Sequence, residues 1–144
     1  MTANTRFPVA VHIMTALAYD RRSWLSSPVL AASVGTNPVV IRRLLGPLHK
    51  AGLVKSHPGK LGGMQLARRA ESITLLDIFN AVEGGSPFAL PEKPRNKACA
   101  VSCAMNGLLA SVLADTDRAL SRSLEKVRLS DLIKEIVEAR TSSR

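Results

Sequence analysis

The fold is decided by residues 26–67, which read SSPVLAASVGTNPVVIRRLLGPLHKAGLVKSHPGKLGGMQLA. Ser26 or Ser27 followed by Pro28 predicts a helix start, because a hydroxyl side chain caps free N–H groups and proline suits the first helical turn. Gly35 ends this short helix, since glycine readily adopts the conformation that follows a last turn. The first of two closely spaced helices is therefore expected here.

A second helix follows at once. Asn37-Pro38 repeats the start signal, and Gly52 ends the helix. Its apolar face carries Val40, Leu44, Leu45 and Leu48, and its other faces carry Arg42, Arg43, His49 and Lys50. Two helices joined by a tight turn, the second one basic, are typical of a helix-turn-helix whose second member enters a DNA major groove. Pro47 lies within this helix and predicts a kink there.

A β-hairpin is predicted directly after this pair. The strand-like segments 53–56 and 64–67 flank a turn rich in Gly and Pro. A hairpin in this position is a wing, with Lys55, His57 and Lys60 on or near its tip. A solvated basic face and an ordinary hairpin are the plain alternatives for each part alone. The order helix, helix, hairpin favours DNA binding.

Composition and charge agree with a folded protein that binds a polyanion. The chain has 144 residues, 46% of them hydrophobic, and a formal net charge of +9. Residues 1–82 hold ten Lys or Arg against three acids, so most of the charge lies in the N-terminal half. Aromatic residues make up only 3%, which leaves little for stacking on unpaired bases. Double-stranded DNA is therefore the expected partner.

The remaining apolar patterns complete a mainly α fold with a small β-hairpin. Helices are expected over 7–20, from the cap Thr74 to Glu83 against the first helix, over 103–128, and from the cap Ser130 to Arg140. We divide the chain into a winged helix-turn-helix domain at 1–83, a linker or sensor loop at 84–98 and dimerisation helices at 99–144.

The long helix predicts a homodimer. Its apolar positions are Met105, Leu108, Leu109, Val112, Leu113, Leu120, Leu124 and Val127. A helix of this length extends beyond a small domain. Much of its apolar stripe is therefore exposed to solvent unless a second copy of the chain covers it. The alternative is a helix that folds back on its own subunit. The last helix is expected to place Leu132, Ile133, Ile136 and Val137 on the core.

The chain has two cysteines, Cys99 and Cys103, about one helical turn apart. A disulfide between them within one turn is strained, so an intersubunit disulfide or a reactive thiol is the easier form of a thiol switch. Inert core thiols are the alternative. An iron–sulfur cluster is disfavoured because it normally takes four ligands, mostly thiolates, and no cofactor is expected.

No enzyme site is evident. The histidines His12, His49 and His57 do not combine with cysteines or carboxylates at metal-ligand spacing. A small thiol-redox enzyme and a duplex-RNA binder are the other candidates, and a steep loss of binding with salt would distinguish nucleic-acid binding from thiol chemistry. No signal peptide or membrane span is recognisable, so we expect a cytoplasmic protein with no membrane partner.

One run is also specific to a family. Residues 51–56 (AGLVKS), Gly59, Gly62-Gly63, residues 66–68 (LAR), 73–78 (ITLLDI) and 81–84 (AVEG) resemble the signature of the Rrf-two (Rrf2) family of bacterial winged-helix transcription regulators. The resemblance implies a dimeric regulator that binds a palindromic operator and responds to a signal near the start of the dimer helix. Pro58 stands where many members have Arg, and only two cysteines stand where cluster-binding members have three.

These patterns define the candidate site residues of a DNA-binding repressor. The expected base-reading residues are Thr36, Asn37, Val39, Arg42 and Arg43, and the expected phosphate-holding residues are Ser26, Ser27, Lys55, His57 and Lys60. Cys99 and Cys103 are the candidate sensor. Thiol oxidation, a cluster and a small ligand framed by residues 84–97 all stay open as the signal.

Overall fold

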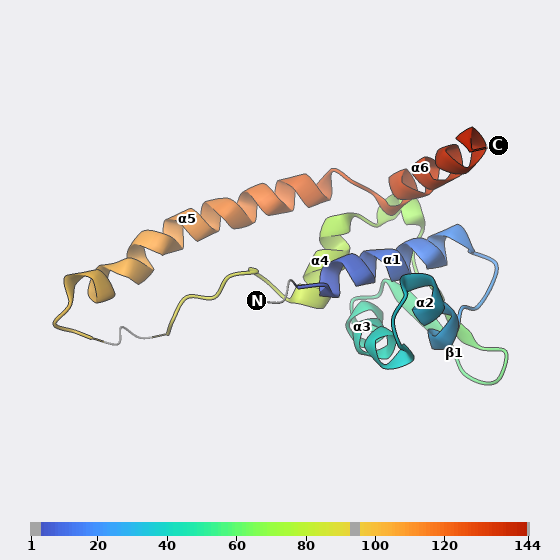
Figure 1. Ribbon diagram of the computed structural model, residues 1–144, viewed down its shortest axis with the longest axis horizontal. Helices are drawn as coiled ribbons and strands as arrows, with labels where there is room; N and C mark the ends of the chain where they lie inside the picture. The colour runs from blue at the N-terminus through green and yellow to red at the C-terminus, as the bar shows by residue number, and fades with distance from the viewer. Residues whose placement is uncertain (1–3, 93–95, 144) are drawn as a thin grey trace.

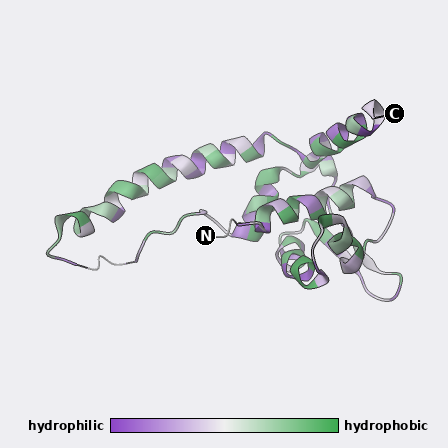
Figure 2. Cartoon of the chain, in the orientation of Figure 1, coloured by the Kyte–Doolittle hydropathy of each residue, from purple (hydrophilic) through white to green (hydrophobic). Residues whose placement is uncertain are grey.

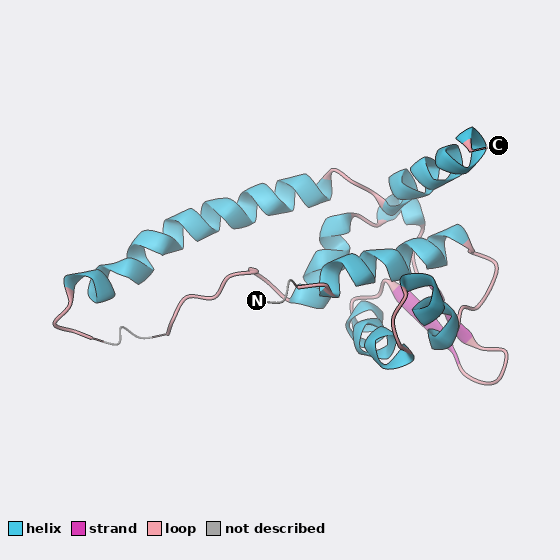
Figure 3. Cartoon of the chain, viewed as in Figure 1, coloured by secondary structure: helices cyan, strands magenta, loops and turns pink. Residues whose placement is uncertain are grey.

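The computed structural model describes residues 4–92 and 96–143. It is mainly helical with one antiparallel hairpin, as predicted (Figures 1 and 3). In chain order the elements are α1 (Arg6–Tyr19), α2 (Ser27–Val34), α3 (Pro38–Lys50), β1 (Val54–His57), β2 (Gly63–Leu66), the 3-10 turn η1 (Ala70–Ser72), α4 (Leu75–Glu83), α5 (Ala100–Glu125) and α6 (Leu129–Ser142). None of the described helices is both long and apolar enough to cross a bilayer.

The helix starts follow the capping signals of the sequence. The Ser26 hydroxyl accepts the N–H of Val29 at 3.4 Å, and the Asn37 side chain accepts the N–H groups of Val39 and Val40 at 3.0 and 3.1 Å. Gly35, with φ +83°, ends α2 in the left-handed conformation that glycine adopts without steric cost. The two helices of the helix-turn-helix therefore have the predicted boundaries.

The core of the winged-helix domain surrounds α1. Ala10, Ile13, Met14 and Leu17 of this helix are at most 1% exposed, and α2, α3, α4 and α6 all pack against it. The predicted packing of α4 on α1 is confirmed. Phe7 meets Phe79 of α4 edge to face, with ring centroids 5.3 Å apart.

The hairpin pairs Val54 with Leu66 and His57 with Gly63 at its ends. A third segment joins it, because Leu25 and Met64 exchange two backbone hydrogen bonds of 3.1 and 2.8 Å. A Cβ on Gly63 would lie 2.6 Å from the backbone of Leu25, so glycine is needed for this close approach. The wing is thus fixed to the segment that precedes α2.

Helix α5 projects away from this domain (Figure 1). None of its residues is buried, and Figure 2 shows apolar and polar residues alternating along it. Its 26 residues make it about 39 Å long at 1.5 Å per residue. The exposed side chains of its predicted apolar stripe include Met105 at 39%, Leu108 at 64% and Val112 at 55%.

The prediction for α6 was partly wrong. The helix begins after Arg128 instead of Ser130, because the carboxylate of Asp131 accepts the Arg128 N–H at 2.8 Å. Leu129 is fully buried, and its N–H bonds to the carbonyl of Ile73 at 2.9 Å. Together, the local bond and the tertiary contact set the N-cap of the helix two residues earlier than the serine signal suggested.

The far half of α6 also departs from expectation. Leu132 and Ile133 pack on the core as predicted, whereas Ile136 and Val137 are 37% and 49% exposed. The core ends at the first turns of α6, with Leu129, Leu132 and Ile133, although the later residues Ile136 and Ala139 still lie beside α1. Helix α3 continues through Pro47 to Lys50, and the expected kink at Pro47 stays a prediction.

Candidate nucleic-acid interface

The start of α3 presents the residues expected to read bases. Arg42 and Arg43 are exposed, and Val39 is 51% exposed. The opposite face of α3 buries Ile41, Leu44, Leu45 and Leu48 in the core, which fixes the orientation of the helix. The helix therefore offers two guanidinium groups and one apolar side chain to a partner beside its first turns.

Some predicted contact residues already have a structural role. The side-chain oxygen of Asn37 accepts two backbone N–H groups, so its amide nitrogen is the group left for a base edge. The Ser26 hydroxyl caps α2 in the same way. Ser27 and Thr36 are half-buried beside these caps, and the Thr36 N–H bonds to the carbonyl of Ala31 at 3.0 Å. These residues shape the turn whether or not they contact DNA.

The wing carries an aromatic platform that sequence reasoning missed. The half-buried Trp24 lies against His57, with ring centroids 5.2 Å apart and an interplanar angle of 32°. The Lys55 Nζ lies 5.7 Å from the centroid of the Trp24 ring, within the range of a cation–π interaction. Residues two apart on a strand share one face, so Trp24 supports both basic side chains of β1 at once.

The sequence signal for the contacts of Trp24 with Lys55 and His57 was the two-residue spacing of these basic side chains on one strand. Side chains at positions i and i+2 of a strand need a neighbour on their common face, but the sequence did not show that the neighbour comes from the segment before α2. Gln65 ties the same segment to β2, because its Nε2 donates to the carbonyls of Arg22 and Ser23 at 3.5 and 3.3 Å. Lys60 lies in the exposed turn beyond these contacts.

A further basic group flanks the wing at the segment after β2. Lys55, Arg21, Arg68 and Arg69 line one shallow depression. Glu71 is the acidic exception: a backbone hydrogen bond lowers the pKa of its carboxyl group, and the nearby Arg69 and Arg21 lower that pKa further. Its carboxylate lies 3.6 Å from the Arg69 guanidinium. The face around the wing remains strongly positive.

Cys99 and Cys103 lie at the far end of α5 from the wing. Cys99 is half-buried at the N-cap of the helix, Cys103 is exposed, and both thiols are free. The Cys103 Sγ lies 3.3 Å from the carbonyl of Lys97, so this thiol contacts its own linker. Cys103 is five residues before Leu108, which at about 100° per residue places it on the other side of the helix from the apolar stripe.

The comparisons with known proteins agree with this geometry. A family model described as Rrf2, iron-dependent transcriptional regulator, matches residues 3–135. The HTH-type transcriptional regulator YwnA of Bacillus subtilis is 34% identical over 131 residues, covering 90% of this chain and 96% of that protein. The structure of T. potens IscR is similar, with a TM-score of 0.71, 26% identity and coverage of 96% of this chain and 90% of that one. CymR, the global cysteine regulator of B. subtilis, has a TM-score of 0.68 at 26% identity, covering 94% and 98% of the two chains.

The iron in that family description requires a suitable set of donor atoms. Within residues 4–92 and 96–143, no three His, Cys, Asp or Glu side chains lie close enough to hold a metal ion together. The chain's two thiols fall short of the four ligands, mostly thiolates, that a cluster takes. The described residues of this chain do not fit an iron site, and we derive no step through iron.

Proposed function

Because the chain belongs to the Rrf2 family of transcriptional regulators, we propose that it acts as a homodimeric repressor on a palindromic DNA operator. The family and the relatives are regulators and not enzymes, so the thiol-redox enzyme considered above is set aside. The observation that carries the proposal is a basic winged helix joined to a long helix with an uncovered apolar stripe.

The stripe supports a second copy of the chain as the partner of α5. Val101, Met105, Leu108 and Val112 follow a spacing of four and three residues along one side of the helix, and all four are at least 39% exposed. Such a spacing is typical of a helix that pairs with another helix. A twofold dimer then presents two copies of α3, which suit two operator half-sites about one DNA turn apart.

Selection of bound duplexes from a random DNA library tests this proposal. We expect an inverted repeat whose half-sites are separated by about 10 base pairs. Arg43→Ala should weaken binding to the selected operator by about 1–3 kcal/mol if this side chain contacts a guanine. Arg122→Ala on α5 is the matched control and should leave the affinity unchanged. Selection of unrelated sequences with no repeat would contradict the proposed palindromic operator. Tighter binding to an RNA duplex of the matching sequence would show that RNA is the preferred partner.

We also propose that modification of Cys103 is the controlling signal. Its exposed thiol contacts the Lys97 carbonyl, so oxidation by peroxide to a sulfenic acid, with release of water, changes the group that holds the linker to α5. Peroxide should weaken operator binding by the parent and by Cys99→Ser, but not by Cys103→Ser. A doubly substituted variant that still responds to peroxide as the parent does would rule out thiol control.

A further inference from the structure

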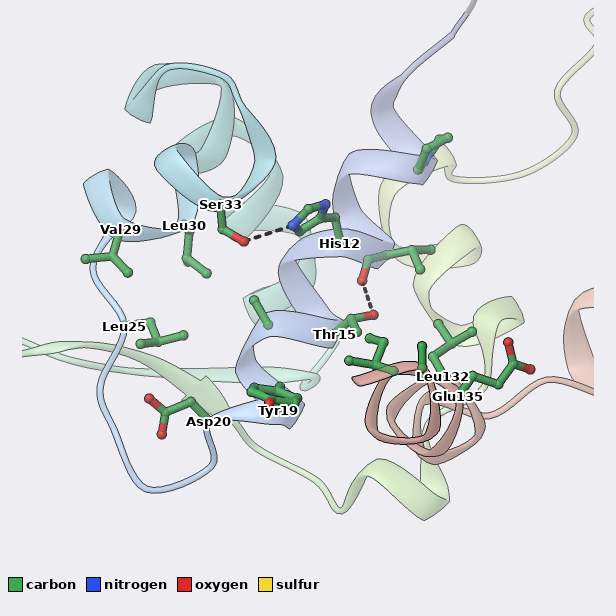
Figure 4. Close-up of a pocket in the computed structure, with 15 residues that line it drawn as sticks. His12, Thr15, Tyr19, Asp20, Leu25, Val29, Leu30, Ser33, Leu132 and Glu135 are labelled. Carbon is green, nitrogen blue, oxygen red and sulfur yellow. Dashed lines mark hydrogen bonds between the residues drawn. The ribbon is translucent and has the colours of Figure 1, made fainter. Parts of the chain in front are cut away.

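A groove of about 790 Å³ lies between α1, α2 and α6, far from the cysteines. Figure 4 shows α1 along its floor, with residues of α2 on one side and of α6 on the other. Its volume falls in the range of small-molecule sites in proteins. The groove joins the first helix of the helix-turn-helix to the helix that follows α5 in the chain.

The walls of the groove are largely apolar and are open to solvent. They are formed by Val11, Ala16, Leu25, Val29, Leu30, Leu132, Ile136 and Ala139. Val29 is 53% exposed and Ile136 is 37% exposed, so both sides offer apolar surface that the described chain does not cover. Burial of such surface by a ligand is favourable in proportion to its area.

The polar groups of the groove favour a cation. Asp20 and Glu135 are the only Asp, Glu, Lys or Arg side chains among its described lining residues, and neither forms a salt bridge within the described chain. Helix α1 ends beside the groove at Tyr19, and helix C-termini carry partial negative charge. Two carboxylates with no cationic lining residue are, on a chain of net charge +9, a local feature that the overall charge does not explain.

Two further polar contacts lie in or beside the groove. His12 Nε2 and the Ser33 hydroxyl lie 2.9 Å apart, which joins α1 to α2 across the groove. Arg140 contacts the Tyr19 hydroxyl but lines the adjoining depression instead of the groove itself. This cationic side chain is therefore already paired with the tyrosine hydroxyl.

We propose that this groove binds an apolar organic cation, with its hydrocarbon body between Val29 and Ile136 and its charge attracted by the carboxylates of Asp20 and Glu135, which lie on opposite sides of the groove (Figure 4). A bound molecule touches α2 and α6 together. It would therefore change the position of the helix-turn-helix relative to α5 and with it the DNA affinity, a consequence that rests on the proposed function. Binding itself does not depend on that function.

Two ions of nearly equal shape and opposite charge test the proposal. Tetraphenylphosphonium and tetraphenylborate are titrated separately into the full chain by calorimetry, without DNA. We expect the phosphonium to bind more tightly, although the net charge of +9 favours the borate. Equal or tighter binding of the borate, or binding of neither ion, would overturn the site.

Variants then locate the bound phosphonium. Glu135→Gln and Asp20→Asn should each lower its affinity about three- to tenfold, because each removes one nearby charge. Asparagine keeps the oxygen that accepts the Ser23 N–H, so the turn at Asp20 is preserved. Glu138→Gln makes the same charge change on α6 outside the groove and should have no effect. Equal losses in all three variants would rule out this groove.

Operator binding with and without phosphonium is measured last. A changed DNA affinity in the parent, absent in Glu135→Gln, would support regulation through the groove. Phosphonium binding with unchanged DNA affinity would leave the site in place and remove its regulatory role. Failure to bind any DNA would contradict the proposed function, whereas the inference that the groove binds a cation would still stand.

Discussion

At the scale of single residues, Trp24 connects the wing to the rest of the domain. It is the only tryptophan of the chain, and its ring contacts the two basic side chains of β1. Lysine and histidine side chains lose rotamer freedom when they are fixed for a phosphate contact. A ring that already holds them reduces the entropy lost on binding, so we expect Trp24 to affect DNA affinity without touching DNA.

Trp24→Ala should therefore weaken operator binding by about 1 kcal/mol, the order of the conformational entropy lost when one long side chain is fixed on binding. Trp24→Phe keeps a ring and should retain most of the affinity. Fluorescence anisotropy with a labelled operator measures both variants. A Trp24→Ala protein that folds normally and binds as tightly as the parent would show that the platform has no role in recognition.

Gly63 is the residue at which the wing meets the segment before α2. Gly63→Ala should lower the free energy of unfolding by more than 1 kcal/mol, because its Cβ would lie 2.6 Å from the backbone of Leu25. Gly46→Ala is the matched control in α3, where a Cβ meets nothing within 4 Å. It should raise stability by about 0.5–1 kcal/mol, as alanine does inside a helix. Urea denaturation distinguishes the two, and similar shifts for both would contradict the close approach.

At the scale of elements, α4 starts with a complete capping box. The Asp77 N–H donates to the Thr74 hydroxyl at 3.1 Å, and the Thr74 N–H donates to the Asp77 carboxylate at 3.0 Å. Thr74→Ala should lower the free energy of unfolding by about 1 kcal/mol. Thr116→Ala removes a hydroxyl from the exposed face of α5 and should change stability far less. Equal losses in urea denaturation would show that the cap contributes nothing specific.

Local signals account for most of the elements that the sequence predicted. The caps at Ser26, Asn37 and Thr74 act within three residues, so a short stretch of chain specifies them. The start of α6 depends on the bond between Leu129 and Ile73, which are far apart in the chain, together with the local bond between Arg128 and Asp131, and the serine signal at Ser130 was therefore misleading. Secondary structure was predictable here to the extent that its determinants were local.

The candidate site divides in the same way. The basic residues of α3 and the wing were predictable because each belongs to one element with a clear pattern. Trp24 and the groove were not, because the first contacts a strand more than 30 residues away and the second is lined by α1, α2 and α6 together. No pattern within a single element carries that information.

At the scale of the whole molecule, the proposed dimer couples stability of the pair to DNA binding. Two linked domains bind a full operator more tightly than one domain binds a half-site, because the second contact becomes intramolecular. The coupling requires α5 to hold the domains at a fixed separation. In the described structure the α5 stripe contributes nothing to the core of its own subunit, so it can be changed without unfolding the winged helix.

Leu108→Glu tests this coupling. Leu108 is 64% exposed, and a charge there should separate the subunits while the circular dichroism of the domain stays unchanged. Ala110→Glu is the control, since two residues turn the helix by about 200° and place the same charge on the other side. Sedimentation should show a monomer for Leu108→Glu only. That variant should lose at least about tenfold in affinity for the full operator and none for a single half-site. A monomeric variant that still binds the full operator as the parent does would show that the two domains act independently, and α5 would then have a purpose other than spacing them on DNA.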